Sequence, residues 1–149
     1  MAIQAAAGAT LAIGTTAAHS NQTEYEADTY TSIGELESIG EFGDEFTLVS
    51  FTGMADARVR KLKGTANAGT LNFSYGFDDD DSGQTALVAA HASTANAEYN
   101  FKATYPSGEV RYFSGHVMTL KEALPNADAV LMVNGTIEVN TAVLKVAAP

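Results

Sequence analysis

The feature that most constrains the fold is an alternation of apolar and polar residues with a period of two. Residues 71–77 read LNFSYGF and residues 99–105 read YNFKATY, so large apolar side chains recur at every second position. Successive side chains of a strand point to opposite faces of its sheet. Each run therefore predicts a β-strand that covers a core with one face.

Further strands are expected around these two. A Pro-Ser-Gly turn at residues 106–108 returns the chain from the second run to a partner strand. Gly115 lies inside that partner, where it indicates a bulge or a close approach by another backbone. Asn134-Gly135 fits either a hairpin turn or a single bent strand. The additional strand candidates are residues 10–15, 30–36, 45–51, 109–120 and 129–139.

One segment departs from this pattern. Residues 82–95 read SGQTALVAAHASTA, which is rich in Ala and free of Pro, and this predicts a helix. Asp81 or Ser82 can cap it, and the acidic turn Asp78, Asp79, Asp80 and Asp81 favours its positive end. The sequence predicts a mainly β fold, an antiparallel β-sandwich or barrel with one flanking α-helix. We expect a single domain over residues 1–149, with residues 1–28 as a candidate flexible arm.

Composition excludes several classes of function. Eight Lys and Arg against eighteen Asp and Glu give a net charge of −10, which argues against tight binding of nucleic acid or of anionic membrane surfaces. The chain has no cysteine, so disulfides, thiolate catalysis and cysteine-based metal sites are ruled out. Residues 1–18 lack the basic start of a signal peptide, and no apolar run approaches the length of a membrane span.

No constellation for catalysis, a cofactor or a metal is complete. An EF-hand beginning at Asp78 fails because its twelfth position is Ala89, although adjacent carboxylates could still bind calcium weakly. His19, His91 and His116 stand apart from one another, and no nucleophile elbow or phosphate-binding glycine pattern occurs. We therefore expect no enzyme, no catalytic residue, no metal site and no cofactor.

Charge is distributed in blocks. Residues 24–45 carry eight acids and no base, whereas all four bases of residues 1–101 lie between positions 58 and 63. Such blocks can complement one another between identical subunits, although solvated loops would give the same pattern.

The basic block lies in a long polar connection at residues 52–69, which is flanked by glycines and expected to be an inter-strand loop. A loop of this length is uncommon in a compact domain unless it has a function. Self-association through an acidic patch on a neighbour, a plain mobile loop and nucleic-acid binding are the three alternatives. The residues assigned to subunit contacts are Thr52, Met54, Asp56, Arg58, Arg60, Lys61 and Lys63.

Several segments, in order along the chain, resemble the major tail tube proteins of long-tailed bacteriophages. The resemblance covers most of the chain, and a long acidic link at residues 19–28 departs from it. The segments are GATLAIG (8–14), TYTSIGELESIGEFG (29–43), GTLNFSYGFD (69–78) followed by Gly83, Gln84 and Leu87, YNFKATYPSG (99–108) and VNGTI (133–137).

The resemblance implies a non-enzymatic virion protein, assembled in the host cytoplasm, that forms hexameric rings. The rings stack into a hollow tail tube, in which the inner sheets join into one barrel. By position, residues 52–69 correspond to the family's loop that reaches the adjacent ring. The implied partners are further copies, the tape-measure protein, and the tail terminator and tip proteins, with no membrane.

DNA would pass through such a tube as transient cargo, and a negative wall would keep phosphates from sticking. Glu35 and Glu37 lie two apart on an expected strand and so would share one face, which makes them the candidate lumen acids. The alternative function is a β-sandwich binding or decoration module on a virion or cell surface. Such a module would be expected to expose clustered aromatic residues, and the chain has no tryptophan.

Overall fold

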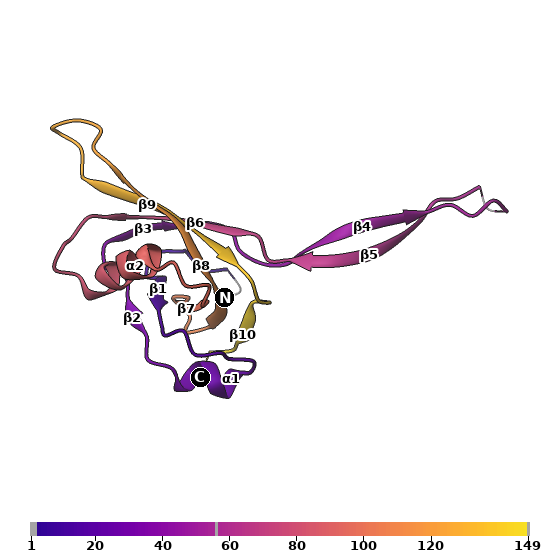
Figure 1. Cartoon of the computed structure of the whole chain (residues 1–149), viewed down its shortest axis with the longest axis horizontal. Coiled ribbons are helices and arrows are strands. Elements are labelled where there is room, and N and C mark those ends of the chain that lie inside the picture. Colours follow the sequence, from indigo (N-terminus) through magenta and orange to yellow (C-terminus); the bar gives the residue numbers. More distant parts are fainter. Residues whose placement is uncertain (1–2, 56, 149) are drawn as a thin grey trace.

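The computed structural model describes residues 3–55 and 57–148. It consists of a curled antiparallel β-sheet with two helices, from which a long two-stranded arm projects (Figure 1). The elements of the body are β1 (Thr10–Ile13), α1 (Gln22–Ala27), β2 (Thr31–Ser32), β3 (Leu36–Ile39), β6 (Thr70–Gly76), α2 (Ser82–Ala92), β7 (Tyr99–Thr104), β8 (Val110–Ala123), β9 (Met132–Val139) and β10 (Leu144–Val146). The arm consists of β4 (Glu45–Phe51) and β5 (Arg60–Asn67).

The body is one sheet with the strand order β2-β1-β7-β8-β9-β6-β3, and β10 pairs with β8 beside it. The 14-residue strand β8 belongs to both halves of this sheet. Its first half pairs with β7 and β10, and its second half pairs with β9. The two layers of the predicted sandwich are thus continuous through β8, and the mainly β antiparallel fold with a flanking helix is confirmed.

The strand bends where Gly115 lies, the one residue of β8 that pairs with both β7 and β9. A β-carbon at Gly115 would collide with the carbonyl oxygen of Glu138, so the predicted close approach of another backbone is confirmed. The register shift between β8 and β9 follows two residues later, between Val117 and Thr119. A bulge at this point increases local twist and helps the sheet to curl.

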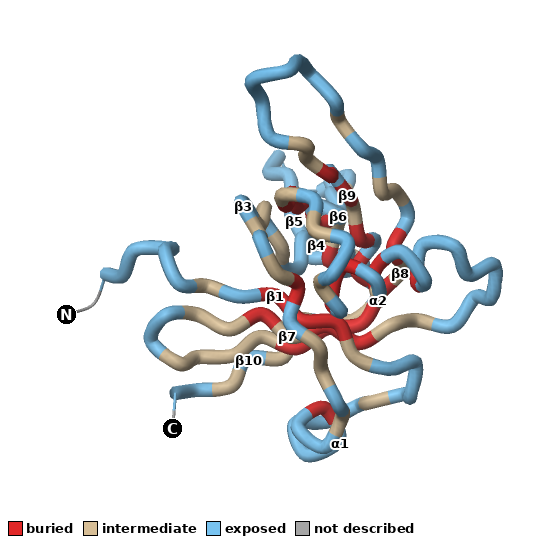
Figure 2. Tube along the Cα trace, turned by 90° about the vertical axis from the view of Figure 1, so that its left-hand side faces the viewer, coloured by how far each residue is buried: buried red, intermediate tan, exposed pale blue. Residues whose placement is uncertain are grey.

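The core lies between the two halves of the curled sheet and beneath α2. Buried segments gather in the strands of the body, whereas the connecting loops are exposed (Figure 2). Phe101 and Phe113 stack with ring centroids 5.5 Å apart, and Phe42 closes over Phe113 at 5.7 Å. The largest fully buried side chains are Tyr75, Phe101, Phe113, Leu11, Leu71, Leu87 and Ile137, together with the polar Asn100.

The helix α2 is anchored at its N-terminus. Asp81 is the N-cap and accepts a hydrogen bond from the Gln84 amide at 2.9 Å, which selects it over Ser82 as the capping residue. The buried Gln84 side chain donates to the carbonyls of Gly34 and Gly76, both at 2.9 Å. Leu87 and Ala90 of the helix are buried. These bonds tie the helix to the ends of β2 and β6.

Several predicted boundaries are wrong. Residues 30–36 were expected as one strand, but Glu35 has a φ of 57° and separates β2 from β3. Residues 129–139 form a single strand only from Met132 onwards, so Asn134-Gly135 is not a turn. Between residues 10 and 28 the expected flexible arm is absent, because β1 pairs with β7 and is buried. The segment also contains a second helix, α1, which the sequence analysis missed.

A partly buried polar network holds this N-terminal segment against the sheet. The Asp28 carboxylate accepts hydrogen bonds from Thr15, from the His19 ring at 3.0 Å and from the Asn100 amide at 2.9 Å. The side chain of Asp28 is only 4% exposed. Burial alone would raise the pKa of this carboxyl, but the hydrogen bonds outweigh it and lower the pKa from 3.8 to about 2.

The network continues into the core. Asn100, in β7, accepts a hydrogen bond from the Ser114 hydroxyl at 2.6 Å, and that hydroxyl lies 2.8 Å from the Tyr25 hydroxyl. The Tyr25 ring stacks on Tyr112 with centroids 5.4 Å apart. Helix α1 is therefore attached to β7 and β8 through both polar and aromatic contacts.

The lowered pKa of Asp28 predicts a stability that depends on pH. A carboxyl with a depressed folded-state pKa stabilises the fold above the unfolded value, near pH 4, and loses this contribution as pH falls towards 2. The shift of Asp28 corresponds to about 2 kcal/mol. Asp28→Asn should lower the free energy of unfolding at pH 7 and remove this part of the pH dependence. Denaturant unfolding between pH 2 and 7 measures both effects.

The matched control is Asp128→Asn, which changes an exposed aspartate in the connection between β8 and β9. It should leave the stability profile unchanged. Equal pH profiles for Asp28→Asn and the unsubstituted chain would contradict the assigned role of Asp28.

Candidate assembly surfaces

The arm is a β-hairpin that leaves the body and extends well beyond it (Figure 1). Within the described residues, β4 and β5 pair with each other and with no other strand. The expectation of an inter-strand loop over residues 52–69 is therefore wrong for Arg60–Asn67, which form β5. The sequence analysis missed this strand because its charged and small residues lack the alternation of a half-buried strand.

Both faces of the arm expose large apolar side chains. Val49 lies opposite Leu62 on one face, while Leu48 lies opposite Lys63 on the other. Leu48 is 64% exposed and Leu62 is 61% exposed. The exposed apolar residues of β4, β5 and the connection between them are Phe46, Leu48, Val49, Phe51, Met54, Val59 and Leu62. A lone hairpin is only marginally stable in water, so its two exposed apolar faces make the arm a candidate contact surface.

The bases assigned to subunit contacts lie on the distal and middle parts of the arm. Arg60, Lys61 and Lys63 belong to β5, and Arg58 directly precedes it. The Lys63 ammonium lies 4.8 Å from the centroid of the Phe46 ring, so this face is both apolar and cationic. Thr52 and the fully exposed Met54 lie in the connection at the tip, and Asp56 lies outside the described residues.

The acidic turn divides into two parts. Asp81 caps α2 and also accepts a hydrogen bond from the Gly34 amide at 3.0 Å, so its role is structural. Asp78, Asp79 and Asp80 bring their carboxylate oxygens within 4.8 Å of one another. Asp78 accepts a hydrogen bond from the Asp80 amide at 3.0 Å, which is the geometry of a turn.

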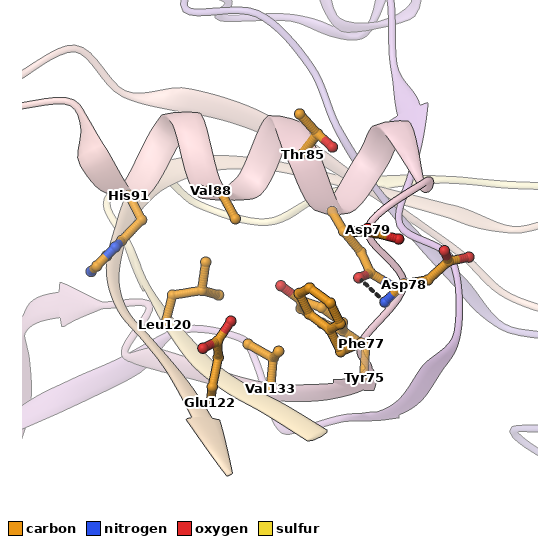
Figure 3. A pocket seen from close by; sticks show the side chains of 11 residues that line it. Tyr75, Phe77, Asp78, Asp79, Thr85, Val88, His91, Leu120, Glu122 and Val133 are labelled. Atoms are coloured by element: carbon orange, nitrogen blue, oxygen red, sulfur yellow. Dashed lines mark hydrogen bonds between the residues drawn. The ribbon is translucent and has the colours of Figure 1, made fainter. Parts of the chain in front are cut away.

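A groove of about 410 Å³ lies beside this turn, between α2 and the strands β6, β8 and β9 (Figure 3). Val88 and His91 face it from the helix, while Phe77, Leu120 and Glu122 face it from the opposite side. Asp78 and Asp79 lie at one end. The groove thus combines an apolar lining with an acidic rim. The sequence analysis missed it because its residues come from four separate segments, although Phe77 and Val88 are exposed apolar residues.

Glu35 and Glu37 are both exposed, but they do not share the face of a regular strand. Glu35 precedes β3 in a left-handed conformation, and Glu37 occupies the register shift between Leu36 and Ser38. The reason given for pairing them is therefore wrong. Glu37 still lies near β6, where it accepts a hydrogen bond from Ser74 at 3.4 Å.

Comparison with known proteins identifies the family. Residues 10–147 match the sequence model of the family described as phage tail tube protein, TTP. The chain belongs to the phage tail tube protein family. This confirms the predicted resemblance and function: the protein is a non-enzymatic structural component of the virion that forms the phage tail tube.

Solved structures share the fold of this tail tube protein at low sequence identity. The SPP1 tail tube has a TM-score of 0.64 and 10% identity over 92% of this chain and 75% of that one. A chain of the native gene transfer agent virion has a TM-score of 0.69 and 12% identity, covering 97% and 100%. The sheath/tube terminator of PVC, an extracellular contractile injection system, has a TM-score of 0.73 and 8% identity, covering 99% of both chains.

No curated protein sequence matches the chain significantly. None of the helices in the described part of the structure is long and apolar enough to cross a membrane. The tail tube protein assembles as a homo-oligomeric tube.

The isolation of the arm predicts that its apolar residues can be changed without loss of the fold. Leu48→Ser with Leu62→Ser should alter the free energy of unfolding of the monomer by no more than about 0.5 kcal/mol, as for other exposed positions. Leu71→Ser, in the buried strand β6, is the contrasting control and should destabilise the protein severely. Denaturant unfolding of dilute protein measures both, and a large loss from the arm variant would contradict an independent arm.

Proposed function

We propose that the tail tube protein closes into rings of six copies, and that the β4–β5 arm of each copy contacts the next ring in the stack. The observation that carries this proposal is the arm itself, whose apolar residues are exposed on both faces. Six-fold symmetry is supported by a gene transfer agent tail refined with C6 symmetry, which has a TM-score of 0.64 and 13% identity over 92% of this chain.

Ring closure uses the edges of the sheet. β3 pairs with β6 on one side, and β2 pairs with β1 at the opposite end of the strand order, so each has no further neighbour among the described strands. Unpaired edges expose backbone donors and acceptors that invite another strand. Joining the edges of neighbouring copies would satisfy these groups and form one continuous barrel around the bore.

The lumen is formed by the polar outer face of β3, β6 and β9. Asn72 and Asn134 are exposed on this face, and the Ser38 and Ser74 hydroxyls lie 2.8 Å apart on it. Glu37 borders the face, and Glu35 precedes it. The same face carries one lysine, Lys121 of β8, which lies opposite Asn134. Most of its other polar groups are uncharged or acidic, so DNA passes as transient cargo with little binding to the wall.

The further partners in this proposal are the tape-measure protein inside the growing tube and the terminator and tip proteins at its ends. The terminator is supported by the similarity to PVC and by the tube-terminating cap of the anti-feeding prophage, with a TM-score of 0.68 and 11% identity. A terminator that shares the fold of the tube subunit can occupy the same stacking surface.

Purified protein should form rings and tubes that negative-stain microscopy resolves. Changing Arg58, Arg60, Lys61 and Lys63 together to Glu should abolish tube growth, because it replaces the cations that offset repulsion between copies of charge −10. The fold should survive, which circular dichroism and unfolding measurements check.

A matched pair isolates the position of the charge. Lys61→Glu with Lys63→Glu should slow tube growth strongly, whereas Lys121→Glu with Lys145→Glu, two exposed lysines of the body, should not. Equal growth of both double variants would remove the arm cations from the stacking contact. Persistently monomeric unsubstituted protein across salt and concentration would overturn the proposed assembly.

A further inference from the structure

We propose that the groove between α2 and strands β6, β8 and β9 is the receptor for the distal end of the arm of a second copy. This inference rests on the proposed function, in which the arm contacts another ring, and it names the surface that receives the arm. The distal end is the segment from Met54 to Lys61, apart from Asp56.

The positions of groove and arm require a second copy as the occupant. The groove lies beside α2 at one end of the long axis of the molecule, and the arm extends from the other end (Figure 1). The arm points away from the groove of its own chain and so cannot fill it. A contact between opposite ends of identical copies is heterologous, and repeating it without closure generates an open stack.

The charges of the two surfaces are complementary. The rim of the groove carries Asp78, Asp79 and Glu122, while the distal arm carries Arg58, Arg60 and Lys61. Tyr75 lines the groove, and its pKa is raised first by burial and then by the nearby carboxylates of Glu122 and Asp81. Cations brought to this rim would be attracted, whereas another acidic surface would be repelled.

The apolar parts are complementary as well. Phe77 and Val88 are about half exposed on the walls of the groove, with Leu120 and Val133 beside them. The distal arm presents Met54 and Val59 to solvent. A flexible thioether adapts to an irregular apolar groove, and burial of such exposed surface favours association. A volume of about 410 Å³ is roughly 14 times that of one water molecule in the liquid, so it admits whole side chains.

The absence of cysteine from the chain allows a direct test by disulfide crosslinking. The double variant Met54→Cys with Val88→Cys places one thiol at the tip of the arm and one in the groove. Oxidation of assembled tubes should link successive copies into a ladder of covalent multimers on a non-reducing gel. The control is Met54→Cys with Ala89→Cys, because Ala89 is also exposed on α2 but does not line the groove.

The outcomes separate this inference from the proposed function. Tubes that give a ladder with the Val88 variant and not with the Ala89 variant support the groove as the receptor. Tubes that give no ladder, or equal ladders with both, overturn the receptor and leave ring stacking intact. Failure of the unsubstituted chain to form tubes under any condition would overturn both.

Charge exchange provides an independent test. Asp79→Lys with Glu122→Lys should raise the protein concentration needed for tube growth at least about tenfold, since unpaired charges at a contact are costly. Glu26→Lys with Asp128→Lys makes the same charge change at exposed positions away from the groove and should have little effect. Adding Arg58→Glu and Lys61→Glu to the groove variant should restore growth. Absence of this rescue would contradict direct pairing of the two surfaces.

Discussion

The body of the protein depends on one strand, β8, being shared by both halves of the sheet. Residues of β8 before Gly115 pair with β7 and β10, and those after it pair with β9. The turn from one half to the other requires the β9 backbone to approach so closely that a β-carbon at Gly115 would meet the Glu138 carbonyl. Because this bend sets how the two halves face each other, it also encloses the single core and positions α2 above it.

The arm, unlike the body, encloses no core of its own. A two-stranded hairpin is marginally stable alone, and the arm leaves apolar side chains in water on both faces. Its pairing is nevertheless regular apart from one shift between Phe46 and Leu48. The body leaves the arm without a covering element, and in the proposed stack other chains supply that cover. In the proposed stack, this division separates folding, which depends on the body, from assembly, which depends on the arm.

β6 and β7 were predictable, because large apolar residues at every second position of each strand face the core. Burial of the polar Ser74 and Asn100 between them was not predictable from that alternation. The helix α2 and its cap were predictable from Ala content and the acidic turn. β5 was not predictable, since a hairpin that is exposed on both faces does not require apolar and polar residues to alternate along its strands. Glu35 was wrongly predicted to lie in a strand, because the sequence of a polar segment gives no sign that one of its residues adopts a left-handed backbone conformation. The groove required tertiary structure, since Phe77, Val88 and Leu120 meet only after the chain has folded.

Because the chain has an excess of acidic residues, the positions of its few bases determine which surfaces of two copies can approach each other. Copies of net charge −10 repel one another in most orientations, and screening over about 8 Å leaves only close contacts sensitive to local sign. The four bases of residues 1–101 all lie on the arm or directly beside β5, and the acidic groove lies at the other end of the molecule. In the proposed stack, approach of arm to groove places opposite charges together. Approach of arm to arm, or of groove to groove, places like charges together, so growth in one direction follows from the same residues that oppose random association.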